Sequence, residues 1–435
     1  MKQAISKTEE IHFSDVRRRL KAIFIGSIGN LVEWYDFYAY TAFALYFANS
    51  FFPGNNPVIQ QLNAAVVFAI GFVMRPIGGW LFGHLADHHG RRRALMLSVL
   101  LMCFGSFVIA VMPTYSSIGP LAPALLGLAR IIQGLSLGGE YGASATYLTE
   151  VADRKHRGFY VSFHYVTLLG GQLCALLVLL VLQQLFLTAD QMRAWGWRIP
   201  FFIGAMLAMI AVTMRRGLHE TDAFVETKKA GIRESSLKTL SKYPRQVLIV
   251  VGLTAGGTTA FYTYTTYMQK FLKLSVGLTD NQTTLVSAGS LIFAICLQPI
   301  YGALSDRIGR KPLLIWFGLM GSVLTIPLLR ALQASTSALA AFLLIAAAWL
   351  IVAGYTSINA VVKAELFPTN VRATGVGLPF AITTSIFGGP AESIALYFKS
   401  IGHEVWFSYY LTSVIAIALL VSVTMRDTKR YSALD

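Results

Sequence analysis

Long apolar stretches follow one another along almost the entire chain, with short polar and basic segments between them. Each stretch holds about 20 residues, the length that an α-helix needs to cross the hydrocarbon core of a bilayer. Backbone groups in lipid must find hydrogen-bond partners within their own segment, and these stretches are too long for barrel strands. The pattern therefore predicts an all-α membrane protein. Its twelve expected spans are 21–49, 59–84, 94–112, 120–148, 158–186, 197–214, 245–272, 282–304, 312–331, 337–362, 373–398 and 404–425.

Composition agrees with a chain that places most of its surface in lipid. Of the 435 residues, 55% are hydrophobic and 13% are charged, whereas soluble domains carry about 25% charged residues. No Walker loop or nucleophile–base arrangement is evident, so we expect neither an enzyme nor a nucleotide-driven pump. The three cysteines lie in apolar segments at unrelated spacings, and we expect no disulfide, no metal site and no bound cofactor.

The net charge of +15 indicates topology rather than a nucleic-acid partner. With the N-terminus in the cytoplasm, 28 of the 36 Lys and Arg residues fall on the cytoplasmic side and only 6 at outer ends of spans. Basic residues collect in cytoplasmic loops of membrane proteins, so both termini are expected there. The longest polar stretch, 215–244, is expected to be a cytoplasmic linker between two six-helix bundles, 1–214 and 245–435.

Two motifs recur in the same order in both halves. Asp87 and Arg91 return as Asp306 and Arg310 at an offset of 219 residues. The pair Glu150 and Arg157 returns as Glu365 and Arg372 at an offset of 215. Such self-similarity indicates two related units. A carboxylate in a basic loop can cap a helix or pair with Arg, so these motifs could latch the halves together on one side, or could only set topology. The candidate latch residues are Asp87, Arg91, Glu150, Arg157, Asp306, Arg310, Glu365 and Arg372.

The repeated glycine–aspartate–arginine loop resembles the signature of the major facilitator superfamily. Within it, four stretches resemble the metabolite:proton symporter family: 30–38, 74–79, 133–141 and 195–201. This resemblance implies two six-helix bundles around a central site that works by alternating access, with the proton as coupling ion. Members carry α-ketoglutarate, citrate, shikimate, or proline and betaine. Similarity to the α-ketoglutarate branch is carried by 165–168, 261–263 and 363–365.

We therefore expect a secondary transporter that takes up α-ketoglutarate or a related dicarboxylate together with protons. Citrate, shikimate and zwitterionic osmolytes such as proline or betaine are the alternatives, followed by a non-transporting membrane receptor or a channel. Drug–proton antiport is disfavoured because the stretch 169–172 has no Gly-Pro pair. The resemblance further implies a monomer in the bacterial inner membrane, whose partners are the organic acid, protons and lipid.

Six charged residues fall well inside the expected spans, away from their ends: Glu33, Asp36, Arg75, Arg130, Glu140 and Glu392. Each costs roughly 2.5–3.5 kcal/mol at a helix centre. Left unpaired, the set would cost about 15–20 kcal/mol, more than the roughly 5–15 kcal/mol of a typical folding free energy. These side chains must therefore pair, face water or change ionisation, and a transport cavity permits all three.

Proton coupling is expected from the acids of the first span. Burial makes a carboxylate easier to protonate, and a nearby Arg opposes this effect. Asp36 or Glu33 is the expected carrier with Arg130 as its partner, and Glu140 is a further candidate. The alternative is a permanent salt bridge that fixes helix packing. Glu392 is equally suited to coupling and to structural pairing.

Substrate binding is expected from buried arginines, because the planar guanidinium matches a carboxylate. Arg75 is the first candidate and Arg130 the second. Tyr262 and Thr265 could add hydroxyl donors, and Arg198 could bind substrate or anchor the outer interface.

Two other polar residues are expected to be structural. Lys363 lies at the inner end of the tenth span, where a long stem can reach water. His164 is a lone histidine within the fifth span, and we expect it to be a core residue.

Overall fold

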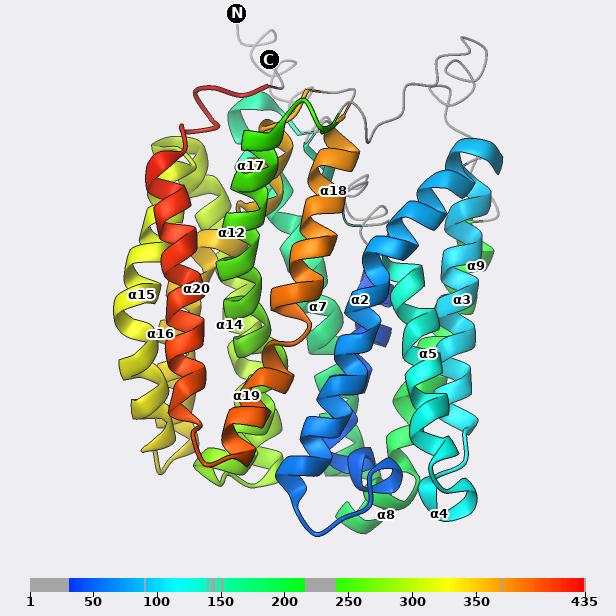
Figure 1. Ribbon diagram of the computed structural model, residues 1–435. Coiled ribbons are helices and arrows are strands. Elements are labelled where there is room, and N and C mark those ends of the chain that lie inside the picture. Colours follow the sequence, from blue (N-terminus) through cyan, green and yellow to red (C-terminus); the bar gives the residue numbers. More distant parts are fainter. Residues whose placement is uncertain are drawn as a thin grey trace, which may run out of the picture.

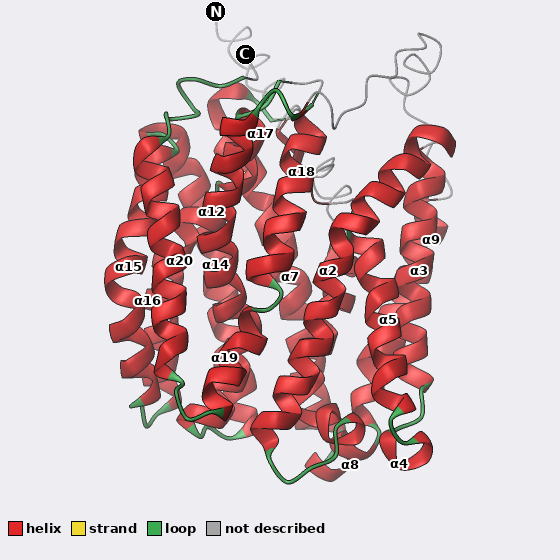
Figure 2. Ribbon diagram, in the orientation of Figure 1, coloured by secondary structure: helices red, strands yellow, loops and turns green. Residues whose placement is uncertain are grey.

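The computed structural model contains helices at all twelve expected positions. It describes residues 31–89, 91–138, 141, 145–146, 148–149, 152–215, 240–368 and 371–433. Within these ranges every regular element is helical (Figure 2). The predicted all-α class is therefore confirmed. Residues 216–239, most of the expected linker, lie outside the described ranges.

The N-terminal spans run through long helices joined by short ones (Figure 1). The long helices are 31–51, α2 (Pro57–His89), α3 (Arg91–Val111), α5 (Leu121–Leu137), α7 (Arg157–Val181) and α9 (Ile199–Arg215). The short ones are α4 (Tyr115–Ile118), η1 (Arg154–His156), η2 (Leu182–Phe186), α8 (Ala189–Ala194) and η3 (Gly196–Arg198).

The C-terminal spans are interrupted by π-helical turns. The seventh span consists of α12 (Pro244–Tyr262), η4 (Thr263–Tyr267), α13 (Met268–Phe271) and η5 (Leu272–Val276). The eleventh consists of α18 (Arg372–Thr383), η6 (Thr384–Gly388) and α19 (Ala391–Ser400). The others are α14 (Asp280–Ile308), α15 (Lys311–Gln333), α16 (Ala338–Thr356) with α17 (Asn359–Glu365), and α20 (Val405–Thr424).

The outer surface is apolar, as a lipid-facing surface must be. Large hydrophobic side chains on many helices are more than 60% exposed, among them Trp80, Leu121, Met206, Leu248 and Leu420. A soluble protein rarely exposes such a continuous apolar surface. Seven of the described helices are also long and apolar enough to cross a bilayer.

Glycines bring the backbones of α2 and α5 into direct contact. A Cβ atom on Gly134 would lie 2.0 Å from the carbonyl oxygen of Gly71, and one on Gly78 would lie 2.0 Å from that of Leu135. Small residues at such positions let membrane helices approach closely. This contact matters for the site, because α2 carries Arg75 and α5 carries Arg130.

The two halves meet along several helix pairs. Helix α7 packs against α14 and α17, and α2 packs against α18 and α19. Figure 1 shows α17 at one end of the molecule and α19 towards the other. Contacts between the halves are therefore present at both ends of the bundle.

The glycine contact predicts that Gly134→Ala lowers the stability of the detergent-solubilised protein. The added methyl group would overlap the α2 backbone, and overpacking costs about 1–3 kcal/mol. Gly127→Ala is the matched control, because a Cβ on that glycine of the same helix meets nothing within 4 Å. Thermal unfolding should show a lower midpoint only for Gly134→Ala. Equal midpoints for both variants would contradict the backbone contact.

Candidate functional site

Buried charged side chains gather in the interior of the bundle. Ten charged side chains among the described residues are at most 5% exposed. Arg310, Glu365 and Arg372 belong to the repeated motifs, and the other seven are Glu33, Asp36, Arg75, Arg130, Lys270, Lys363 and Glu392. Five of these seven were expected well inside the spans, whereas Lys270 was not singled out and Lys363 was expected at the inner end of the tenth span. The expected Glu140 lies outside the described residues. Each buried charge raises the question of what compensates for its lost hydration.

Asp36 is held by neutral hydrogen-bond donors. Ser106 donates to its Oδ1 atom, and Gln133 Nε2 donates to its Oδ2 atom at 3.0 Å. Gln133 also accepts from Arg130 Nη1 at 2.6 Å. The amide therefore stands between the acid and the cation, and none of the ion pairs among the described residues joins Asp36 directly to Arg130. Protonation of Asp36 would not break an ion pair at this position.

Helix α9 leaves room for the carboxylate of Asp36. A Cβ atom on Gly204 would lie 2.2 Å from Asp36 Oδ1. The carboxylate is thus enclosed by α3, α5 and α9. Sequence reasoning placed Asp36 beside Arg130 but did not single out Gln133, a neutral residue in one of the motif stretches.

Arg130 lies among aromatic rings. Its guanidinium carbon is 4.6 Å from the ring centroid of Phe37, 4.7 Å from that of Tyr40 and 5.0 Å from that of Phe68. Aromatic faces stabilise a cation through their quadrupoles. Its Nε and Nη2 atoms are buried with no hydrogen-bond partner among the described residues.

Arg75 has a similar aromatic environment but faces a pocket. Its guanidinium carbon is 3.9 Å from the ring centroid of Phe72 and 4.6 Å from that of Phe37. Its Nε and Nη2 atoms make no hydrogen bond within the described part of the chain. Two donors of a buried guanidinium are thus available to a ligand.

A small pocket with a cavity volume of about 20 Å³ lies beside Arg75, between the two halves. Its lining residues are Trp34, Arg75, Leu137, Gly138, Tyr141 and His164 from the N-terminal half and Gly377, Phe380 and Ala381 from α18. An apolar wall with a few polar groups is typical of a small-molecule site. His164 is buried and contacts the Tyr141 ring edge-on.

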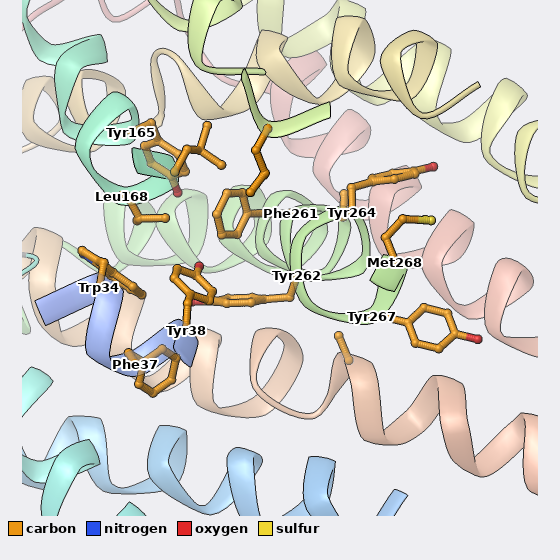
Figure 3. Packing of buried hydrophobic residues seen from close by; sticks show 14 of the residues in the cluster. Trp34, Phe37, Tyr38, Tyr165, Leu168, Phe261, Tyr262, Tyr264, Tyr267 and Met268 are labelled. Carbon is orange, nitrogen blue, oxygen red and sulfur yellow. The ribbon is translucent and has the colours of Figure 1, made fainter. Parts of the chain in front are cut away.

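Tyr262 and Thr265 lie on the seventh span, which faces the first span (Figure 3). The Tyr262 ring packs edge-on against Phe72 at 5.0 Å, and its hydroxyl interacts electrostatically with Arg75. The Thr265 hydroxyl donates to the carbonyl oxygen of Phe261 at 2.7 Å. Tyr262 therefore lies next to Arg75, whereas the Thr265 proton is already engaged.

Arg198 lies away from this pocket. Its Nη1 atom donates to the carbonyl oxygens of Ala110 and Met112 at 2.9 and 2.8 Å. Its guanidinium carbon also lies 4.4 Å from a Trp197 ring centroid. These contacts tie the start of α9 to the end of α3, in agreement with the anchoring alternative.

Lys270 forms an ion pair that sequence reasoning missed. Its Nζ atom lies 3.2 Å from Glu392 Oε1 and donates to the carbonyl oxygen of Thr41 at 2.6 Å. Neighbouring Gln269 donates to the carbonyl oxygen of Ala42 at 3.1 Å. The first, seventh and eleventh spans are therefore joined. The signal was the set of apolar residues that continue beyond Lys270, at Phe271, Leu272, Leu274 and Val276.

At the other end, the second copy of the repeated motif joins the two halves. Asp306 accepts hydrogen bonds from the backbone N–H groups of Gly158 and Phe159, each at 2.8 Å. A carboxylate at a helix N-terminus is favoured by the unpaired N–H groups and the helix dipole. Asp306 also pairs with Arg310 at 2.8 Å. The aspartate of the C-terminal half therefore caps α7 of the N-terminal half.

Glu365 extends this network. Its Oε1 atom lies 3.4 Å from Arg310 Nη2 and 3.7 Å from Arg157 Nη1. Arg157 belongs to the N-terminal half, so this pair also crosses between halves. Arg372 donates to the carbonyl oxygen of Phe367 at 3.2 Å. For the first copy of the motifs, the side chains of Asp87, Arg91 and Glu150 lie outside the described residues.

Comparisons with known proteins agree with this architecture. The family model described as "Major Facilitator Superfamily" matches residues 38–390. The "Alpha-ketoglutarate permease" of Escherichia coli K12 is 51% identical over 97% of each chain. The "Citrate-proton symporter" of Salmonella typhi is 34% identical over 85% of each chain. The "Proline/betaine transporter" of E. coli K12 is 32% identical over 94% of this chain and 83% of the relative.

Solved structures give the same fold. The crystal structure of a D-xylose-proton symporter superposes with a TM-score of 0.73 at 17% identity, covering 95% of this chain and 99% of the symporter. The expected family is confirmed by these matches, and the relatives are permeases and transporters rather than enzymes. The chain belongs to the Major Facilitator Superfamily.

Proposed function

We propose that this protein is a proton-coupled symporter that carries α-ketoglutarate or a related dicarboxylate into the cell by alternating access. The observation that carries the proposal is Arg75, whose Nε and Nη2 donors have no hydrogen-bond partner among the described residues and lie beside a pocket between the two halves. The permease with 51% identity supports the choice of substrate. The protein would lie in the bacterial inner membrane with both termini in the cytoplasm.

Substrate binding would begin at Arg75. A guanidinium and a carboxylate form charge-assisted hydrogen bonds in a planar, two-pronged arrangement. Binding would supply hydrogen-bond partners to Nε and Nη2 of Arg75, two buried donors that have none among the described residues. This gain favours the bound state. The Tyr262 hydroxyl, which interacts with Arg75, would contact the same carboxylate or the keto oxygen.

Proton coupling would centre on Asp36. When ionised, its carboxylate accepts from Ser106 and Gln133. When protonated it becomes a donor, so at least one of these contacts must reverse or break. Gln133 would pass this change to Arg130 through their 2.6 Å hydrogen bond. Glu33 and Glu140 remain additional candidates for coupling.

The glycine contact would link the proton site to the substrate site. Gln133 and Arg130 lie on α5, whose backbone touches α2 through Gly134 and Gly71. Because α2 carries Arg75, a shift of α5 after protonation would move the guanidinium that binds substrate. Bulky residues at this interface would leave the two helices free to move separately.

Alternating access would depend on contacts at the two ends of the bundle. The Lys270–Glu392 pair and its bond to Thr41 would hold the outer end closed. The network of Asp306 and Glu365 would be the cytoplasmic latch. Two six-helix units, 1–214 and 245–435, would rock against each other around the pocket, with 215–244 as the linker. Asp87, Arg91, Glu150 and Arg372, the other residues of the repeated motifs, would complete the latches.

Transport by purified protein in proteoliposomes tests the proposal. Labelled α-ketoglutarate should accumulate when the outside is acidic, and a protonophore should abolish accumulation. Arg75→Lys keeps the charge but loses the planar fork, so its apparent affinity should fall by about tenfold, equivalent to 1.4 kcal/mol. Succinate, citrate, shikimate and proline serve as competitors. Failure to accumulate any of these solutes would overturn the proposed function.

Neutralising Asp36 should separate exchange from accumulation. Asp36→Asn removes the group that would carry the proton, so proton-driven accumulation should be lost while exchange of internal for external substrate persists. Retained exchange also shows that the variant folds. Glu33→Gln is the paired variant. If both variants kept full proton-driven accumulation, the assignment of coupling to these acids would be wrong.

Asp306→Asn should slow transport several-fold without reducing the amount of protein in the membrane. The amide can no longer form the charge-assisted cap on α7 or the ion pair with Arg310. Asp280→Asn is a matched control in the first turn of the same helix, where Asp280 pairs with Lys273 at 2.7 Å. Unchanged transport by Asp306→Asn would remove the latch role.

A further inference from the structure

Lys363 is a buried cation that has no carboxylate partner among the described residues. It lies in α17 and is 0% exposed. Within the described part of the chain, its Nζ atom has one polar contact, with the Tyr355 hydroxyl at 3.4 Å. None of the ion pairs among the described residues includes it. An isolated buried ammonium is costly unless another group compensates for its lost hydration.

Lys270 is a second buried lysine of the same protein, and its ammonium group has both an acidic and a carbonyl partner. It is also 0% exposed, but it pairs with Glu392 at 3.2 Å and donates to the Thr41 carbonyl oxygen at 2.6 Å. Lys363 has neither kind of partner. The two lysines therefore differ in what they leave available to a ligand, although their burial is equal.

Aromatic rings place Lys363 at the wall of the Arg75 pocket. Its Nζ atom lies 4.2 Å from the ring centroid of Phe380 and 5.3 Å from that of Tyr141. Both rings line the pocket with Arg75. They stack on each other with their centroids 3.5 Å apart. The ammonium therefore lies close to two side chains that line the pocket.

The stacked rings come from different halves of the protein. Tyr141 belongs to the N-terminal half, and Phe380 lies on α18 of the C-terminal half. Rocking of the halves would separate the rings and bring Lys363 into contact with the pocket. Opening the pocket and exposing the second cation would then be one movement.

The Tyr355 hydroxyl, the polar contact of the ammonium, begins a chain of neutral hydrogen-bonding groups. The Tyr355 hydroxyl donates to Asn359 Oδ1 at 3.0 Å, and Asn359 Nδ2 donates to the Tyr165 hydroxyl at 2.7 Å. These groups can orient around a bound carboxylate. Because they are neutral, they do not compete with the carboxylate for the ammonium, as another anion would. Tyr165 lies on α7, so this chain of hydrogen bonds also crosses between the halves.

We propose that Lys363 binds one carboxylate of the substrate while Arg75 binds the other. A dicarboxylate would then connect a cation of the C-terminal half with a cation of the N-terminal half. A monocarboxylate or a zwitterion would satisfy only one of them, which makes Lys363 the residue that selects dianions. This inference rests on the proposed function and specifies which substrates the site prefers.

The test compares α-ketoglutarate with 2-oxopentanoate, in which a methyl group replaces the distal carboxylate. Binding to the purified full-length protein is measured by calorimetry and by competition with labelled substrate. The wild type should bind α-ketoglutarate about 10–100-fold more tightly, as expected for hydrogen bonds to a charged group. Equal affinity of the wild type for the two acids would overturn the inference without any variant.

Lys363→Met removes the charge and keeps a similar length. It should lower the affinity for α-ketoglutarate by the same 10–100-fold and leave that for 2-oxopentanoate unchanged. Lys363→Arg should restore part of the preference. Equal weakening of both acids, with no recovery in Lys363→Arg, would show a structural role and overturn the inference.

Lys270→Met is the control for removal of a buried lysine at a site that does not contact the pocket. It should leave the ratio of the two affinities at the wild-type value. The proposed function fails separately, if wild-type protein accumulates no α-ketoglutarate in response to a proton gradient. Wild-type accumulation of α-ketoglutarate with an unchanged ratio in Lys363→Met would overturn only the role of Lys363.

Discussion

Charges can be buried in a bilayer protein only where other groups compensate for their lost hydration, and this constraint shapes the interior of the molecule. Three solutions occur side by side. Neutral donors hold the Asp36 carboxylate, aromatic faces surround Arg130, and an acid pairs with Lys270. Arg75, whose Nε and Nη2 atoms have no hydrogen-bond partner among the described residues, lines a pocket between the halves, and Lys363 lies close to the Phe380 ring of the same pocket. In the proposed function, these two cations would meet the ligand.

Close helix contacts make the buried charges act together. The α2–α5 backbone contact joins the two helices that carry Arg75 and Arg130. Ion pairs and caps between the halves add contacts at both ends of the bundle. In the proposed cycle, charge changes at Asp36 and Arg75 would therefore be transmitted by rigid helices to the ends.

Much of the fold follows from the sequence, because bilayer thickness fixes the length of each span and the repeated motif marks the two halves. The buried acids and arginines were also found, because charges are rare in apolar segments. The burial of Lys270 and Lys363 was not foreseen, since a lysine near a span end can reach water on its long stem. The seventh span continues through α13 and η5 to Val276, which leaves Lys270 inside it. Gln133 was overlooked because a neutral amide carries no charge signal.

The central claim is that acid and proton cross together. Its most direct test follows the external pH of lightly buffered proteoliposomes as α-ketoglutarate is added, with the labelled acid counted in the same vesicles. If the acid and the proton cross together, the external solution should become alkaline in step with uptake in the wild type, and it should not do so with Asp36→Asn. Entry of the labelled acid into wild-type vesicles with no change in external pH would contradict proton-coupled transport.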